Sequence, residues 1–245
     1  TAFSSSAFAQ STQPWAVEVE LGAIATSGNT ETTSLNAKLD AKQHLEKFNN
    51  EYILTALYKK DDVTQDDGSK VSEKTAEKFF ASAKSAYQLS TENKSYLFGF
   101  VSHTHDQFGA YRDYSTVALG YGDWLYSTDT FRWFAEAGPG YFRGEKVIEP
   151  DVVGDPLIFE TQSGALLRLA TEIEWNLSAT AVFKQTLSVE TGSDNTRSQS
   201  ETSLAAAINH TMQMKVALAI ANDSKVDEDK EPTDITTSIT LVYKF

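Results

Sequence analysis

Two histidines are the side chains whose type and spacing come nearest to a reactive pair. His103 and His105 are two residues apart, so in an extended strand both side chains leave the same face. We place this face on the polar, interior side of the sheet, opposite Phe98 and Phe100. A serine hydrolase would need a nucleophile on that face within hydrogen-bond reach of a histidine. Ser102 is adjacent to His103 and points the other way, so we predict no nucleophile and base pair here.

Carboxylates flank the histidine pair. Asp106 follows the strand, and Asp113 stands across the next connection. Two imidazoles with a carboxylate resemble a weak metal site, but the spacing fixes no further ligand. We therefore interpret these side chains as polar interior residues and predict no metal site and no cofactor.

A pair of glutamates offers a second kind of chemistry. Glu172 and Glu174 share a face of one strand, as the paired carboxylates of glycosidases do. Arg168 lies further along the same face, so charge pairing is the simpler interpretation. We predict no catalytic residues and expect that the protein is not an enzyme.

The elements that must position these residues are strands with a two-residue period. The carboxy-terminal stretch Asp234–Phe245 is apolar on one face and polar on the other, with Val242 as the exception. It is longer than the roughly 5–6 residues usual in soluble proteins and suits a tilted membrane strand of about 9–11 residues. Its apolar face carries the residues that we predict to be the assembly signal, Ile239, Leu241, Tyr243 and Phe245.

Eleven further segments alternate in the same way. One of them, Lys74–Leu89, has a helix-like composition, but its odd positions keep the two-residue period. Gln185 is a polar break on an otherwise apolar face. The expected strands are Trp15–Thr26, Thr32–Gln43, Asn50–Lys60, Lys74–Leu89, Ser95–Asp106, Tyr114–Tyr126, Phe131–Phe142, Ile158–Asn176, Ala179–Thr191, Arg197–Asn209, Gln213–Asp223 and Asp234–Phe245.

Composition narrows the classes of protein. The chain has 21 basic and 34 acidic side chains and a net charge of −13, which argues against nucleic acid as a partner. It has no cysteine, so neither disulfides nor thiolate metal sites are available. The longest apolar run, Val216–Ala221, is far short of the roughly 18 residues of a transmembrane helix. A membrane β-barrel stays compatible, because half of each strand faces a polar interior.

The amino-terminal residues suggest an exported protein. Residues 1–13 are small and uncharged, and Ala7-Phe8-Ala9 has the small-x-small form of a signal-peptidase site. We predict that residues 1–9 are the remnant of a signal peptide, 10–14 a leader and 15–245 the folded domain.

The connections between strands alternate in length. Those near 44–50, 90–94, 127–130, 176–179 and 210–213 are short, and those near 61–73, 106–113, 143–157, 191–196 and 222–233 are longer or more polar. An even strand number with short turns at one end is typical of bacterial outer-membrane barrels, and closure leaves no unpaired edge in lipid. We predict an all-β, antiparallel transmembrane barrel of about 12 strands with both termini periplasmic. Its interfacial aromatic belt would comprise Trp15, Tyr87, Trp124, Tyr126, Trp175 and Tyr243.

Several short motifs resemble a known family. They are Ser27-Gly28-Asn29-Thr30, His105-Asp106-Gln107-Phe108, Tyr111-Arg112-Asp113-Tyr114, Gly120-Tyr121-Gly122, Glu136-Ala137-Gly138-Pro139-Gly140-Tyr141 and Thr240-Leu241-Val242-Tyr243-Lys244-Phe245. From about Trp15 to Phe245 the chain is similar to the YdiY-like family of salt-induced outer-membrane proteins, which has no agreed activity. At the position of Gln107 that family is usually basic. The resemblance implies a barrel inserted from the periplasm into the outer membrane of a Gram-negative bacterium and carries over no catalytic residue.

The charges that we place inside the barrel are balanced. Eleven basic and eleven acidic side chains point inward in the expected register. This favours ion pairs across the interior over steering of solutes of one charge. The basic set is Lys38, Lys42, Lys59, Lys78, Lys84, Arg132, Arg168, Lys184, Arg197, Lys215 and Lys244, and the acidic set is Glu18, Glu20, Asp40, Glu51, Glu136, Glu172, Glu174, Glu190, Glu201, Asp223 and Asp234.

The excess negative charge must then lie mostly outside the lumen. Residues 61–73 carry Asp61, Asp62, Asp66, Asp67 and Glu73 against Lys70. Solvated loops are one interpretation, and a site for divalent cations, which also bridge lipopolysaccharide, is the other. The remaining expected partners are outer-membrane lipid and the barrel-assembly machinery. We expect a structural or envelope-stress role, with a narrow pore for small neutral or zwitterionic solutes as the alternative and a surface hydrolase third.

Overall fold

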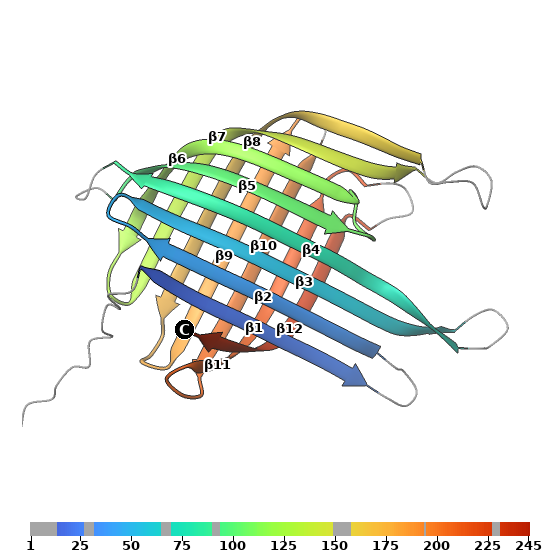
Figure 1. The fold of residues 1–245 in the computed structure, drawn as a ribbon, viewed down its shortest axis with the longest axis horizontal. Coiled ribbons are helices and arrows are strands. Elements are labelled where there is room, and N and C mark those ends of the chain that lie inside the picture. The colour runs from blue at the N-terminus through green and yellow to red at the C-terminus, as the bar shows by residue number, and fades with distance from the viewer. Residues whose placement is uncertain are drawn as a thin grey trace, which may run out of the picture.

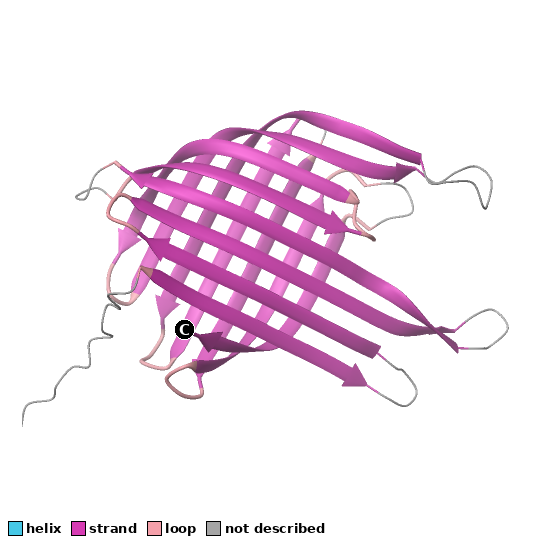
Figure 2. Ribbon diagram, viewed as in Figure 1, coloured by secondary structure: helices cyan, strands magenta, loops and turns pink. Residues whose placement is uncertain are grey.

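The computed structural model describes residues 14–26, 32–64, 70–89, 94–148, 158–193, 195–226 and 231–245. In these ranges twelve strands form one closed antiparallel barrel, in which each strand pairs with the next and β12 pairs with β1 (Figure 1). The described part of the chain consists of strands and loops (Figure 2). Within it, no helix has the length and apolar character needed to span a membrane. The predicted signal-peptide remnant and the Ser27–Thr30 turn lie outside the described residues.

The strands alternate in direction around the barrel. Their bounds are β1 Trp15–Thr26, β2 Thr32–His44, β3 Phe48–Thr64, β4 Lys70–Gln88, β5 Tyr96–Asp106, β6 Asp113–Ser127, β7 Phe131–Ile148, β8 Ile158–Asn176, β9 Ala181–Gly192, β10 Thr196–Ala207, β11 Met212–Asp223 and β12 Thr233–Lys244. The predicted number and order of strands are confirmed, and so is the assignment of the helix-like segment Lys74–Leu89 to a strand.

Two hairpins are longer than the alternation of apolar and polar residues in the sequence predicted. Residues Asp61–Thr64 pair with Lys70–Glu73, so β3 and β4 extend into the stretch that we expected to be a loop. The register shifts between Lys59 and Lys60, where a bulge lets the pairing continue. β7 likewise continues to Ile148. The β3–β4 and β7–β8 hairpins project beyond the barrel rim in Figure 1. The acidic residues Asp66 and Asp67 lie outside the described residues.

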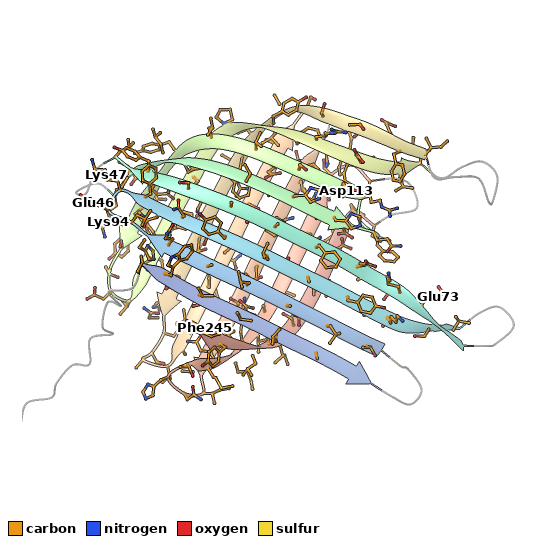
Figure 3. All side chains as sticks on the ribbon, in the orientation of Figure 1. Glu46, Lys47, Glu73, Lys94, Asp113 and Phe245 are labelled. Carbon is orange, nitrogen blue, oxygen red and sulfur yellow. The ribbon has the colours of Figure 1, made fainter. Side chains whose placement is uncertain are left out.

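The two rims of the barrel differ. The connections β2–β3, β4–β5, β6–β7, β8–β9 and β10–β11 lie at one rim, which we call the turn end, together with the start of β1 and the end of β12. The connections β1–β2, β3–β4, β5–β6, β7–β8, β9–β10 and β11–β12 lie at the other rim, the loop end. Figure 3 shows Glu46, Lys47 and Lys94 at the turn end and Glu73 and Asp113 at the loop end.

The outer face of the barrel carries most of the exposed large apolar side chains. Leu119 and Ile235, for example, are 70% and 66% exposed, as expected for side chains that face lipid. At the turn end aromatic rings contact one another in pairs, such as Trp15 with Tyr52 and Phe48 with Tyr87. Five residues of the predicted belt are exposed there, namely Trp15, Tyr87, Tyr126, Trp175 and Tyr243.

One member of the predicted belt is misplaced. Trp124 does not face lipid but packs inside the barrel against the buried cluster of Ala86, Tyr96 and Phe98. The even-numbered side chains of β6 face the lumen, and this alternation continues as far as Trp124. The register becomes irregular only after it, between Trp124 and Tyr126.

Closure of the barrel depends on a short seam. β1 and β12 are paired at four positions, from Glu18 opposite Lys244 to Leu21 opposite Leu241. By comparison, β1 and β2 are paired along the whole of β1. The interior contacts that cross this seam therefore carry a large share of its stability.

Candidate functional site

The lumen is the candidate site, and one wall of it is packed with aromatic rings. Tyr96 and Phe98 of β5 are buried inside the barrel, with Phe100 packed against them. A Cβ atom at Gly120 would lie 2.7 Å from the Phe98 ring, and one at Gly122 would lie 2.4 Å from the Tyr96 ring. Glycine on β6 therefore allows these rings to lie flat against the neighbouring strand.

This arrangement overturns the predicted orientation of β5. We expected the aromatic residues to face lipid and His103 and His105 to face the lumen. The reverse is found, because the even positions of the strand are buried while Leu97 and Val101 are each 50% exposed. The rings pack closely against the glycines of β6, and this contact takes the place of lipid contact for these side chains.

Ion pairs link the packed wall to the strands beside it. The Lys84 ammonium lies 2.9 Å from one carboxylate oxygen of Glu136, and the Tyr96 hydroxyl donates to the same oxygen at 2.9 Å. Lys84 also lies 3.6 Å from Glu51, which in turn lies 3.4 Å from Lys42. Glu136, in the Glu-Ala-Gly-Pro-Gly-Tyr motif, is therefore a buried carboxylate paired with Lys84 and Tyr96.

A second ion-pair group lies beside the seam. The Lys215 ammonium of β11 donates to both carboxylate oxygens of Glu20 on β1 at 3.1 Å, and to Glu201 of β10 at 2.8 Å. Thr240 of β12 lies between them and is buried. Lys215 thus connects β10, β11 and β1 across β12.

Side chains also reach through the interior between strands that are not neighbours. The Arg168 guanidinium of β8 lies 3.9 Å from the centre of the Phe100 ring on β5 and 3.3 Å from Glu190. The Thr116 hydroxyl of β6 donates to Glu190 of β9 at 3.0 Å. These contacts narrow the lumen.

A cavity of about 150 Å³, which we call the mid-lumen cavity, remains beside these contacts. Its lining is mixed in chemistry, with three cations, two carboxylates and several hydroxyl groups around aromatic rings. The lining residues that carry charge or a ring are Glu51, Lys84, Arg168, Glu190, Arg197, Phe80, Phe100 and Tyr114.

The loop end of the lumen is covered in part by the β5–β6 loop. A second cavity of about 230 Å³, which we call the mouth cavity, is lined by Phe108, Gly109 and Ala110 of this loop and by Asp223 and Asp234 of the opposite wall. The loop is anchored by Asp106, whose carboxylate accepts from the Phe108 amide at 3.2 Å and lies 3.0 Å from the Lys78 ammonium. Asp106 is thus an inward, paired carboxylate that the sequence-based count of interior charges omitted.

The predicted pairing of interior charges is confirmed, although some partners differ. Glu174 pairs with Arg132, Glu172 with Lys184 at 3.0 Å, and Arg168 with Glu190 rather than with either glutamate of its own strand. The two glutamates are thus occupied in ion pairs with different strands. Gln185, the polar break in β9, is also satisfied, because its amide donates to Ser200 at 2.9 Å.

His103 and His105 lie on the outer wall near the loop end, and a serine does share their face. Ser115 of β6 lies opposite His103 in the register, and its Oγ is 2.9 Å from the histidine Nδ1. Our prediction that these histidines face the lumen without a serine was therefore wrong. Pairing between strands, which the histidine strand alone does not reveal, brings the serine there. Within the described residues, no group of three or more candidate ligands is arranged to hold a metal ion.

The predicted assembly residues occupy the outer face of β12. Ile239 is 58% and Phe245 75% exposed, and the rings of Tyr243 and Phe245 contact each other edge to face. Their role as an assembly signal stays a prediction.

Comparison with known proteins agrees with this architecture. The Escherichia coli (strain K12) protein named "Uncharacterized protein YdiY" is 29% identical over 236 residues, which cover 96% of this chain and 85% of that protein. The translocator domain of autotransporter NalP from Neisseria meningitidis has a TM-score of 0.52 at 12% identity and covers 97% of this chain and 90% of its own. The NanC porin has a TM-score of 0.50 at 6% identity, covering 93% and 98%. At these identities the two structures show a shared fold, that of outer-membrane β-barrels.

The sequence also matches one family model over nearly its whole length. The model is described as "Protein of unknown function, DUF481" and matches residues 19–245. The match begins within β1 and covers the other eleven strands, which confirms the resemblance to YdiY-like proteins. The chain belongs to the DUF481 family of proteins of unknown function.

Proposed function

We propose that this barrel is a narrow pore for small neutral or zwitterionic solutes in the outer membrane of a Gram-negative bacterium. In this proposal both termini face the periplasm and the loop end faces outward. The apolar outer face and the aromatic rings at the turn end fit a barrel seated in lipid and inserted by the barrel-assembly machinery.

The observation that carries the proposal is the partly open, polar interior. Lys42 and Lys244 line the inner wall with side chains 35% and 39% exposed, whereas Glu136, on the packed wall, is 2% exposed. One side of the lumen is therefore filled with rings, and the other side is accessible to water at the turn end, where Lys42 and Lys244 lie. The mid-lumen cavity and the mouth cavity are two further openings in the interior.

The chemistry of the mid-lumen cavity favours solutes without net charge. Arg168 and Arg197 face Glu51 and Glu190 around it, so a solute with both signs finds a partner for each. A solute of one charge would compete with ion pairs that already exist. Phe100 and Tyr114 add flat apolar surfaces of the kind that pack against sugar rings or aliphatic groups.

A closed structural barrel is the second candidate. The contacts from Arg168 to Phe100 and from Thr116 to Glu190 cross the lumen and support a barrel that does not conduct. In that case the protein would serve the envelope mechanically, with lipopolysaccharide and divalent cations at its acidic hairpins as partners. An envelope-stress role of this kind stays a prediction.

Conductance in planar lipid bilayers separates the two candidates. The pore predicts steady single-channel current from the refolded protein. Arg168→Ala should increase that current, because it removes the side chain that bridges to Phe100. Arg132→Ala is the matched control, since its side chain is 50% exposed and pairs with Glu174 near the turn-end rim. A folded protein that carries no current, with or without Arg168, would support the closed barrel instead.

A further inference from the structure

A group of polar side chains lies on the outer wall of β5 and β6 near the loop end. The His103 Nδ1 atom is 2.9 Å from Ser115 Oγ, and the His103 Nε2 atom is 3.6 Å from Asp113 Oδ1. The His105 Nδ1 atom contacts the same aspartate oxygen at 2.8 Å. The stick view shows Asp113 at this rim (Figure 3). A serine, a histidine and a carboxylate are thus connected in the order that a hydrolase uses.

We propose that Ser115, His103 and Asp113 form a catalytic triad for hydrolysis of lipid esters on the outer wall of the barrel. Ser115 can donate its proton to Nδ1 only when the other nitrogen of His103 carries the ring proton. Nε2 is the nitrogen that faces Asp113, and a carboxylate there stabilises this tautomer and the imidazolium that forms. The 3.6 Å separation is long for a hydrogen bond, as catalytic contacts often are before substrate binds.

A cation lies next to the proposed nucleophile. Arg143 of β7 is the register partner of Ser115, so the two side chains leave the same outer face of adjacent strands. One Nη atom of Arg143 donates to Glu145 at 3.0 Å. The guanidinium has five N–H donors, so this contact leaves others for the oxyanion of an ester under attack.

The position of the triad indicates the substrate class. One step toward mid-barrel on the same strands, Val101, Val117 and Tyr141 are 50%, 53% and 51% exposed and form part of the apolar outer face. The row of His103, Ser115 and Arg143 therefore begins where the lipid-facing surface becomes polar. Acyl esters of membrane lipids have their ester groups at this boundary between hydrocarbon and head group. They are therefore the substrates that can reach a triad at this position.

The reaction balances without a cofactor. Ser115 Oγ attacks the ester carbonyl carbon while His103 takes the hydroxyl proton. The bond from the carbonyl carbon to the alkoxy oxygen breaks, and His103 gives its proton to the departing lyso-lipid alcohol. Water then attacks the acyl-serine, again losing a proton to His103, and the fatty acid leaves as Ser115 regains its proton. The net reaction is ester plus water to fatty acid plus alcohol.

The test uses the refolded protein in mixed micelles with a p-nitrophenyl ester of a fatty acid and, separately, a fluorophosphonate label. We expect hydrolysis and one label on Ser115 by mass spectrometry. Ser115→Ala and His103→Ala should each lower hydrolysis at least about 100-fold and abolish labelling. Ser163→Ala is the matched control, because Ser163 lies on the same outer row and only accepts a hydrogen bond from Tyr141 at 2.9 Å. Its activity should equal that of the wild type.

Heat-modifiable migration on gels confirms that each variant is folded. A folded wild type that neither hydrolyses the ester nor takes the label would overturn the proposal. So would equal loss of activity in Ser163→Ala. The bilayer current of Ser115→Ala should be unchanged, since the serine lies outside the lumen, so the triad and the pore can fail independently.

Discussion

Replacement of Lys215 by Met should open the seam of the barrel. The Lys215 ammonium lies 3.1 Å from both carboxylate oxygens of Glu20, and its side chain is 10% exposed. At that distance two unit charges attract by about 5 kcal/mol at an effective dielectric of about 20, and desolvation offsets part of this. Breaking a buried pair by removing one partner typically costs about 3–5 kcal/mol. Glu20 would keep Lys38 at 3.9 Å as its nearest cation.

Lys244→Met is the matched control on the same seam. Lys244 pairs with Glu18 at 2.8 Å, but the two side chains are 39% and 40% exposed. Exposed ion pairs are usually worth about 0–1 kcal/mol, so this variant should lose little stability. Both substitutions remove one positive charge beside the seam, and they differ in burial and in the number of carboxylates that the lysine contacts, two for Lys215 and one for Lys244.

The assay is urea unfolding of each protein refolded into lipid vesicles, followed by tryptophan fluorescence. We expect Lys215→Met to lower the free energy of unfolding by about 3–5 kcal/mol and Lys244→Met by about 1 kcal/mol or less. Equal losses, or a loss below about 1 kcal/mol for Lys215→Met, would refute the idea that this buried contact holds the seam.

Three further predictions concern register, assembly and selectivity. Leu218→Arg should lower the free energy of unfolding by about 2–4 kcal/mol near the bilayer midplane, because Leu218 faces outward and is 40% exposed. Ala219→Arg should lower it less, because position 219 faces the lumen. Equal losses in vesicle unfolding would contradict the register. Deletion of Tyr243–Phe245 should leave unfolded chain in the periplasm, since it removes aromatic residues from the closing strand; a compact, heat-modifiable band in outer-membrane fractions would count against the assembly signal. Any bilayer current should be weakly cation-selective at low salt, and reversal potentials should show this preference fading as the Debye length falls from about 10 Å at 0.1 M to about 3 Å at 1 M. Strong selectivity at 1 M salt would show that the interior charges are not balanced.

Alternation predicted most of the barrel because one face of each strand meets lipid and the other meets a polar interior. It failed for β5, where Tyr96 and Phe98 pack inside against Gly120 and Gly122. Nothing in β5 itself distinguishes rings that face lipid from rings that face a glycine-lined wall. The two glycines on the neighbouring strand were the available signal.

The outer-wall triad could not be predicted for a related reason. Ser115 meets His103 only when the register between β5 and β6 is known, and the error in the β5 face placed the histidines on the wrong side. In the same way, the partner of Arg168 is Glu190 on β9, which strand-by-strand analysis does not reveal. The pattern within each segment was enough to predict which residues form strands. The contacts between strands depend on the register, which only the structure of the closed barrel shows.

A single introduced thiol tests the conducting lumen most directly. The chain has no cysteine, so Gln199→Cys places one reactive group on the wall of the mid-lumen cavity. Its register partner Ser188 lines the same cavity, whereas the adjacent position Ser200 leaves the opposite face of β10. Bilayer current through Gln199→Cys should fall when a membrane-impermeant methanethiosulfonate reagent is added, and current through the control Ser200→Cys should not. A thiol at position 199 that reacts without changing the current, or that never reacts, would contradict a water-filled pore at this level of the barrel.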